Sequence, residues 1–275
     1  MPNHITNIIA VSGDESRIRT MLKAVQNDEI GIGSVDFNKI IPMPDNVDSY
    51  NWAIANWGTK WNSYGYTEET DLKDGKLTFL TAWSAPHPIL QRLSEMYPDI
   101  RFEHEWADED IGMNCGRHEY FDGERIGEYY PESNRERIEF AARVMGSDPS
   151  EWSLFLNASE TDYVFFTDEE FEVVEVAGQA ALFTNSRITD ADIPKGLYCY
   201  HLRQGDDGNF CALEKSVKVN HAGSVITREP LDLGEKGYIS FDNDSSPNFT
   251  GETMLMEEFV SSDSGQSESM DMGVS

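Results

Sequence analysis

Residues 100–106 read Ile-Arg-Phe-Glu-His-Glu-Trp, and this stretch decides the fold of the first half of the chain. Ile100, Phe102, His104 and Trp106 alternate with charged residues, and a period of two predicts a strand whose side chains point to opposite faces in turn. One of these faces is apolar and aromatic, whereas the other carries arginine and glutamate. We therefore expect a sheet with one face in the core and the other in solvent.

The segments around this strand alternate between strand and helix patterns, and Leu77, Phe79 and Trp83 fall on one face of a second strand. In chain order we expect strand His4–Ser12, a helix opened by a capping box at Ser12–Glu15, the tryptophan-rich segment Asn51–Asn62, strand Leu77–Trp83, a helix from Ser84 to about Tyr97, the strand above, and a hairpin of His118–Phe121 and Arg125–Tyr130. The order is then β-α-β-β-α-β with an extra hairpin, which is the split βαβ or ferredoxin-like plan. The name describes topology only, because one cysteine in this segment cannot hold an iron–sulfur cluster.

The second half of the chain has a different character. A third helix opens at a capping box of Ser133 and Glu136 and stops at Gly146, and from Gln179 onward short strands are separated by glycine-rich and aspartate-rich turns. The fold class is therefore α+β. We expect a ferredoxin-like domain at residues 1–131, a helical connector at 132–166, a small mainly-β domain at 167–260 that closes with a short helix in Thr250–Val260, and a disordered acidic tail at 261–275.

Length and charge bound the function. The chain has 275 residues, of which 39% are hydrophobic, so each of two domains can bury its own core. Its 50 acidic residues against 21 basic ones leave a formal net charge of -29. This field repels phosphate backbones and anionic membranes and attracts basic surfaces, so direct nucleic-acid binding is disfavoured. The same charge can also serve solubility alone, and composition does not separate these two interpretations.

Cysteine usage indicates the compartment. Cys115, Cys199 and Cys211 are sparse, odd in number and without a CxxC pair, so we expect reduced thiols and a cytoplasmic protein. The first residues lack the basic and apolar regions of a signal peptide, and no later run approaches the length of a membrane span. We therefore expect neither secretion nor membrane insertion.

Four stretches of the first half resemble the ferredoxin-like domain of YubB-type plasmid proteins and related phage proteins. They are Met1–Asn3, Asp36–Pro44, Asn56–Asn62 and Thr81–Pro86. The second half, from about Thr167 to Val260, is similar to a large polyvalent protein-associated domain of mobile elements. Its matching stretches are Ala181–Asn185, Ile193–Tyr200, Val219–Gly223 and Asn248–Gly251. Both resemblances imply a phage, prophage or plasmid origin, and neither implies a reaction or a set of functional residues.

Signals for catalysis are weak. The six histidines show no metal-ligand spacing, and His104, on an apolar strand face, is expected to be a hydrogen-bonded core residue. Cys199 and His201 lie on one face of a predicted strand, so a Cys/His site remains an alternative, although a nucleophile also needs an orienting third group. Phosphate-binding glycine loops and EF-hand ligand patterns are missing from the sequence. We therefore expect neither a cofactor nor a metal.

The leading hypothesis is a non-enzymatic accessory protein of a phage or plasmid that binds and inhibits a host factor, such as a nucleic-acid-handling defence protein, through an acidic surface. Candidate partner-binding residues are Trp57, Lys60, Trp61, Asp108, Glu109, Asp110, Asp168, Glu169 and Glu170. One alternative is an enzyme or enzyme accessory with a site near Cys199 and His201. A further alternative is a single-stranded nucleic-acid-binding sheet, but the charged strand face carries Arg101, Glu103 and Glu105 in place of stacking aromatics.

Overall fold

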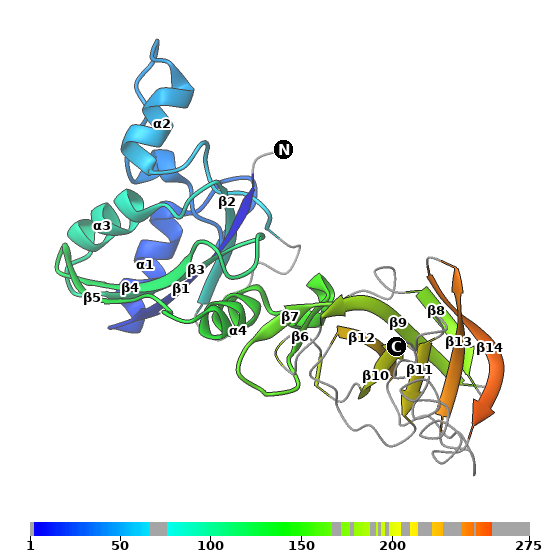
Figure 1. Ribbon diagram of the computed structural model, residues 1–275. Coiled ribbons are helices and arrows are strands. Elements are labelled where there is room, and N and C mark those ends of the chain that lie inside the picture. The colour runs from blue at the N-terminus through cyan, green and yellow to red at the C-terminus, as the bar shows by residue number, and fades with distance from the viewer. Residues whose placement is uncertain are drawn as a thin grey trace, which may run out of the picture. The chain divides into compact units, whose positions relative to one another are not determined.

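The computed structural model of the chain falls into two compact units, residues 1–151 and 152–275 (Figure 1). It describes residues 3–66 and 76–166 in full, together with Ala191, Pro194 and Lys195 and the backbone of the strands between 172 and 254. Within these residues, no helix combines the length and the apolar character that a membrane crossing requires.

The first unit is built on a five-stranded sheet in the order β2-β1-β3-β4-β5. Its strands are β1 (His4–Ser12), β2 (Lys76–Ala82), β3 (Arg101–Asp108), β4 (Cys115–Phe121) and β5 (Glu124–Tyr129). Because β1 pairs antiparallel with both β2 and β3, these two strands run parallel to each other on either side of it, and helix α3 (His87–Met96) connects them. This is a split βαβ unit to which β4 and β5 add the predicted hairpin. The predicted ferredoxin-like α+β fold is confirmed.

One element of the predicted order is different, because a helix stands where the plan has an edge strand. Helix α2 (Ser49–Trp57) begins where the Asp48 side chain accepts hydrogen bonds from two amides of its first turn, and it ends at Gly58, whose φ is 77°. What remains of the strand is one antiparallel bridge between Tyr64 and Leu80. The Tyr64 amide donates to the Leu80 carbonyl oxygen at 3.1 Å, and the Leu80 amide donates to the Tyr64 carbonyl oxygen at 2.7 Å. Strong local capping signals therefore outweigh the strand that the topology calls for.

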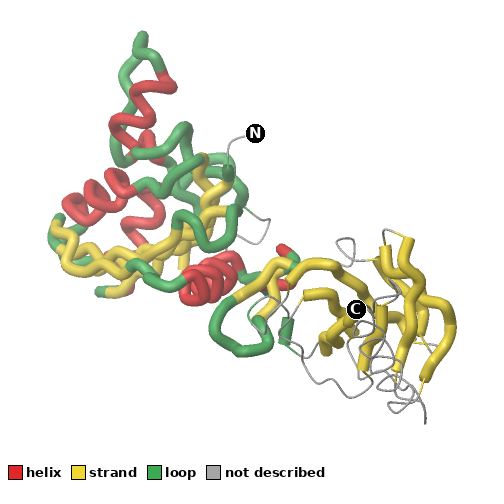
Figure 2. Tube along the Cα trace, viewed as in Figure 1, coloured by secondary structure: helices red, strands yellow, loops and turns green. Residues whose placement is uncertain are grey.

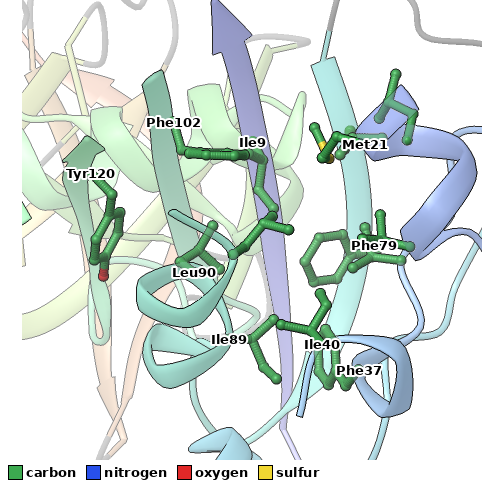
Figure 3. Packing of buried hydrophobic residues seen from close by; sticks show 14 of the residues in the cluster. Ile9, Met21, Phe37, Ile40, Phe79, Ile89, Leu90, Phe102 and Tyr120 are labelled. Carbon is green, nitrogen blue, oxygen red and sulfur yellow. The ribbon is translucent and has the colours of Figure 1, made fainter. Parts of the chain in front are cut away.

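The main core lies between one face of the sheet and helices α1 (Glu15–Val25) and α3, and the short 3-10 helix η1 (Phe37–Lys39) packs against it (Figures 2 and 3). Removing one large apolar side chain from water contributes about 1.5–3 kcal/mol to stability. The fully buried side chains of this core include Ile9, Met21, Phe37, Phe79, Leu90 and Phe102. The alternation predicted for residues 100–106 is confirmed, since Phe102, His104 and Trp106 are all buried.

The helix caps agree with the sequence signals except at α1, whose N-cap lies two residues later than predicted. The Asp14 side chain accepts hydrogen bonds from the first amides of α1, so Asp14 is the N-cap and the prediction of Ser12 for that role was wrong. Helix α4 (Asn134–Met145) has the predicted capping box, in which the side chains of Ser133 and Glu136 each accept a hydrogen bond from the other residue's amide.

Helix α4 packs on the opposite face of the same sheet, where it buries a smaller apolar cluster of Ala107, Cys115, Phe140, Ala141 and Val144. It therefore belongs to the first unit, which extends to residue 151. The prediction of a helical connector at 132–166 was wrong, because its helix covers the sheet and the segment beyond residue 153 forms strands. A helix with one apolar stripe needs a partner surface, and the second face of the sheet provides it.

In the second unit, β6 (Leu154–Leu156) and β7 (Tyr163–Phe165) form a hairpin, and seven further strands form a sheet in the order β14-β13-β11-β10-β12-β9-β8. Their bounds are β8 (Glu172–Val176), β9 (Gln179–Arg187), β10 (Tyr198–Gln204), β11 (Phe210–Leu213), β12 (Ala222–Thr227), β13 (Tyr238–Asp244) and β14 (Ser246–Met254). The prediction of a short helix in Thr250–Val260 was wrong for the first half of that segment, because residues up to Met254 belong to strand β14. The predicted tail at 261–275 lies outside the described residues.

A row of buried polar side chains crosses the core face of the first sheet. His104 Nε2 lies 3.0 Å from Asn7 Oδ1, and the Asn7 amide donates to Thr81 Oγ1 at 2.9 Å. His87 and His118 pack beside His104, with their own ring centroids 4.5 Å apart. His104 is therefore the hydrogen-bonded core residue that its strand position predicts. In the part of the chain that the structure describes, no three His, Cys, Asp or Glu side chains are placed to hold a metal ion.

We predict that the protein loses stability in acid because of the buried cluster of His87, His104 and His118. Burial lowers the pKa of His87 and of His118 from 6.5 to about 4, with a further contribution from Arg125, and it lowers the pKa of His104 well below its usual range. Since the unfolded chain binds these protons more readily, the free energy of unfolding should be fully retained above about pH 6.5 and should fall as the pH drops toward 4. Urea unfolding across this range measures the slope, and a His87→Gln variant should show a shallower one. An equal slope in both proteins would contradict the assignment to burial.

Two glycines at helix ends provide a matched test of the corner between α2 and α3. Gly58 and Gly146 both have φ near 70°, so an alanine costs about 1–2 kcal/mol in backbone strain at either position. A Cβ at Gly58 would also lie 2.8 Å from Pro88 Cδ, whereas one at Gly146 meets open space. Gly58→Ala should therefore lower the free energy of unfolding by more than Gly146→Ala, as measured by denaturant titration. Equal losses would show that α2 and α3 are not tightly packed there.

Candidate binding surface

Two of the stretches that carry the first resemblance are fastened to each other at the end of β2. The Thr59 hydroxyl donates to the Ala82 carbonyl oxygen at 2.8 Å and lies 3.1 Å from the Ala82 amide, from which it accepts. Both residues are buried, so water does not compete for these bonds. The Trp83 amide then donates to the Asn3 carbonyl oxygen at 2.9 Å. A loop, a turn and the start of β1 are thereby held in one corner of the domain.

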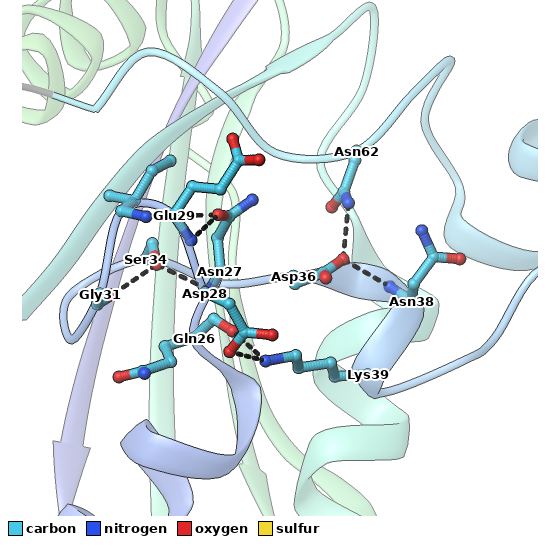
Figure 4. A network of polar contacts seen from close by, with 11 residues as sticks. Gln26, Asn27, Asp28, Glu29, Gly31, Ser34, Asp36, Asn38, Lys39 and Asn62 are labelled. Atoms are coloured by element: carbon cyan, nitrogen blue, oxygen red, sulfur yellow. Dashed lines mark hydrogen bonds and ion pairs between the residues drawn. The ribbon is translucent and has the colours of Figure 1, made fainter.

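The remaining stretch joins the same corner through Asn62 (Figure 4). The Asn62 amide donates to the Asp36 carboxylate at 2.7 Å, and its side-chain oxygen accepts from the Phe37 amide at 2.9 Å. The indole N–H of Trp57 donates to the Ile41 carbonyl oxygen at 2.9 Å. All four stretches of the first resemblance therefore meet at one end of the sheet.

Three aromatic rings gather around one ammonium group at this corner. Lys60 Nζ lies 5.8 Å from the ring centroid of Tyr50, 4.9 Å from that of Trp61 and 4.5 Å from that of Trp83. These distances are within the range of cation–π attraction. The three aromatic residues are 42%, 38% and 44% exposed, respectively. We call Tyr50, Lys60, Trp61 and Trp83 the aromatic–lysine cluster.

Trp83 has an unusual backbone. Strand β2 ends at Ala82, and Trp83 has φ of 71°, a left-handed value that is rare for a bulky residue. The prediction that Trp83 falls on the same strand face as Leu77 and Phe79 was wrong, because β2 ends at Ala82 and this turn brings the Trp83 ring to the surface. Backbone strain of this kind costs about 1–3 kcal/mol and tends to occur where it serves a function.

An acidic turn follows β3 and consists of Asp108, Glu109 and Asp110. Asp108 is only 7% exposed and accepts hydrogen bonds from the Asp110 amide at 2.9 Å and from the Asn3 side chain at 3.3 Å. Burial raises the pKa of Asp108, partly offset by these hydrogen bonds. Asp108 therefore shapes the turn, while Glu109 and Asp110 are exposed to solvent.

The acidic turn and the aromatic–lysine cluster are linked through His4 and Tyr64. His4 Nδ1 lies 2.6 Å from the Tyr64 hydroxyl, and the Tyr64 ring is 6.0 Å from that of Trp61. On the other side, the Glu109 amide donates to the His4 carbonyl oxygen at 2.9 Å. Burial raises the pKa of Tyr64, and the charge of Glu109 acts in the same direction. Exposed aromatics, one cation and two exposed carboxylates thus share one surface.

The structure sorts the predicted binding residues into three groups. Lys60, Trp61, Glu109 and Asp110 lie together at the surface described above. Trp57 and Asp108 are buried, since Trp57 is 3% exposed and packs in the main core, and Asp108 is 7% exposed. Three further candidates, Asp168, Glu169 and Glu170, lie outside the described residues. Sequence reasoning did not identify Tyr50 and Trp83, which come from a helix and a strained turn that only the folded chain brings beside Lys60.

On the charged face of β3 and β4, the glutamates are paired with arginines. Arg143 from α4 bonds both carboxylate oxygens of Glu105 at 2.9 Å, and Arg101 pairs with Glu119 across the strands at 3.6 Å. Arg117 lies 3.9 Å from Glu103 in the same way. Because these cations neutralise much of the local acidic charge, this face does not offer a concentrated negative patch.

The alternative Cys/His site falls in the second unit. Cys199 and His201 lie two residues apart in β10, and their side chains are outside the described part of the chain. Cys115 in the first unit is buried, and burial raises the pKa of its thiol, as expected for an inert structural cysteine.

Comparison with known families finds one match in each half of the chain. Residues 57–148 match the family described as the ferredoxin-like domain in Api92-like protein, and residues 167–261 match large polyvalent protein associated domain 28. The first match includes α4, in agreement with its place on the sheet, and both resemblances drawn from the sequence are confirmed. A comparison with curated proteins found no match. Neither match covers half of the chain, and domains of both kinds are typical of accessory proteins of mobile genetic elements.

Proposed function

We propose that this chain is a non-enzymatic accessory protein of a phage or plasmid that binds a basic host protein and blocks its activity. The observation that carries the proposal is the shared surface of the aromatic–lysine cluster and the acidic turn. Such a surface fits a macromolecular partner better than a small substrate, because each of its aromatic side chains is more than a third exposed to solvent.

Exposed aromatic residues support a role in binding. Tryptophan and tyrosine are enriched among the few residues that supply most of the energy of protein interfaces. Here one tyrosine and two tryptophans, each more than a third exposed, lie in one patch. The corner beneath them is held by buried hydrogen bonds, so little ordering cost is left for the binding step.

Charge supports a basic partner. The chain carries a net charge of -29, and many carboxylates of the first unit are already paired with arginine. Glu109 and Asp110 are different, because they are exposed and take part in none of the ion pairs found among the described residues. Unpaired carboxylates attract a cationic surface over about a Debye length and speed the encounter.

A nucleic-acid-handling defence protein fits this description, because its binding channel is basic and has to accept phosphate. A rigid acidic protein can occupy such a channel in place of nucleic acid. The resemblance to domains of mobile elements supports this choice of partner, since an accessory protein of a phage or plasmid meets host defence proteins on entry.

The proposal predicts two separable effects in a binding assay with purified host nucleases. Trp61→Ala and Trp83→Ala should each weaken binding by about 1–3 kcal/mol, mainly through faster dissociation. A double variant, Glu109→Gln with Asp110→Asn, should slow association at low salt and reduce the dependence of affinity on salt. Surface-based kinetics across a salt series measures both.

The matched control is Phe121→Ala, which removes an aromatic residue of similar exposure, 42%, from the hairpin at the opposite end of β3 and β4. It should leave binding unchanged. Equal losses for Phe121 and Trp61, or an affinity that does not respond to salt, would contradict the proposed surface.

A further inference from the structure

The aromatic–lysine cluster has the form of a cage. Its rings come from three separate segments, with Tyr50 in α2, Trp61 in the loop after Gly58, and Trp83 in the turn after β2. The rings of Tyr50 and Trp83 stand perpendicular to each other, at an interplanar angle of 89° and a centroid distance of 6.0 Å. Three π-faces around one point create a site that favours a positive charge.

The group inside this cage is the chain's own lysine. Lys60 contacts three rings and forms no ion pair within the described residues, although the chain contains 50 acidic residues. Its ammonium is carried on a flexible four-carbon stem, so it can swing into solvent by rotation of side-chain bonds alone. The Lys60 backbone stays in place because its amide donates to the Ala82 carbonyl oxygen at 3.4 Å.

The walls of the cage do not depend on Lys60. Trp83 is fixed by its left-handed backbone and by its amide bond to Asn3, and Tyr50 belongs to a capped helix. Lys60 also borders a cavity of about 240 Å³, whose other lining residues are mostly apolar: Met43, Ser49, Tyr50, Ala53, Trp57 and Trp61. These apolar walls suit the aliphatic stem of an incoming lysine side chain.

We propose that Tyr50, Trp61 and Trp83 form a receptor cage for a lysine side chain of the partner, and that Lys60 fills this cage in the free protein. A basic partner inserts its own lysine and displaces Lys60 into solvent. The inference rests on the proposed function for its basic partner, but the cage can be tested without any partner. An internal occupant lowers the apparent affinity for an external one by the fraction of time that the cage is filled.

The test uses Nα-acetyl-lysine methylamide as the probe and the indole N–H signals of Trp61 and Trp83 as the NMR readout, on the full chain. In a Lys60→Ala variant these signals should shift and saturate, with a dissociation constant at least about fivefold lower than in the unaltered protein. The Nε-acetylated probe, which has no charge, should not bind. Lys76→Ala is the matched control, because it removes the same charge from the far end of β2 and should behave like the unaltered protein.

Two outcomes would overturn the cage. One is equal probe affinity in the unaltered and Lys60→Ala proteins, and the other is saturable binding that persists when Trp83→Ala is added to Lys60→Ala. Thermal unfolding of each variant shows whether it is folded, and Lys60→Gln, which keeps the stem and removes the charge, replaces Lys60→Ala if the latter is not. Probe binding without any host-protein binding would refute the proposed function and leave the cage intact. The reverse result would refute the cage alone.

Discussion

The paired hydrogen bonds between the Thr59 hydroxyl and the Ala82 backbone are the contact on which this end of the molecule depends. An edge strand would normally satisfy the outer amide and carbonyl of β2 along its length. Here one side chain does so at Ala82, and one backbone bridge does so at Leu80. In place of an edge strand, the described residues 40–66 form α2 and a loop. Those two segments supply Tyr50, Lys60 and Trp61.

The acidic side chains of the first unit differ in whether a nearby arginine neutralises them. On the charged face of β3 and β4, which α4 partly covers, arginines from neighbouring strands and from α4 lie against the glutamates, so the charges there are largely internal to the fold. Exposed pairs of this kind contribute little to stability, roughly 0–1 kcal/mol each, but they remove the local field. The exposed carboxylates of the acidic turn, Glu109 and Asp110, keep their local electrostatic field. Charge counted over the whole sequence therefore overstates how much of the surface is available to attract a partner.

Sequence reasoning succeeded where one local signal decided the structure. The alternation in residues 100–106 fixed β3 and its buried face, and the capping box at Ser133 fixed the start of α4. It did not succeed where two signals competed or where tertiary contacts decided. The topology required an edge strand, yet Asp48 and Gly58 bounded a helix, and the stripe on α4 did not reveal which surface it would cover. Trp83 continued the parity of a strand that in fact ends one residue earlier, so no periodicity could have placed it beside Lys60.

A cage that already holds a lysine affects specificity more than affinity. Any ligand has to replace the contacts that Lys60 makes with three rings, so a neutral side chain gains apolar contact but leaves a displaced cation without its partners. A cationic side chain restores those contacts and also gains the field of Glu109 and Asp110, which lie at the same end of the sheet. An acidic partner loses on both counts. In the proposed mode of binding, the cage therefore favours a basic partner surface over a neutral or acidic one, and the chain's high negative charge adds long-range attraction.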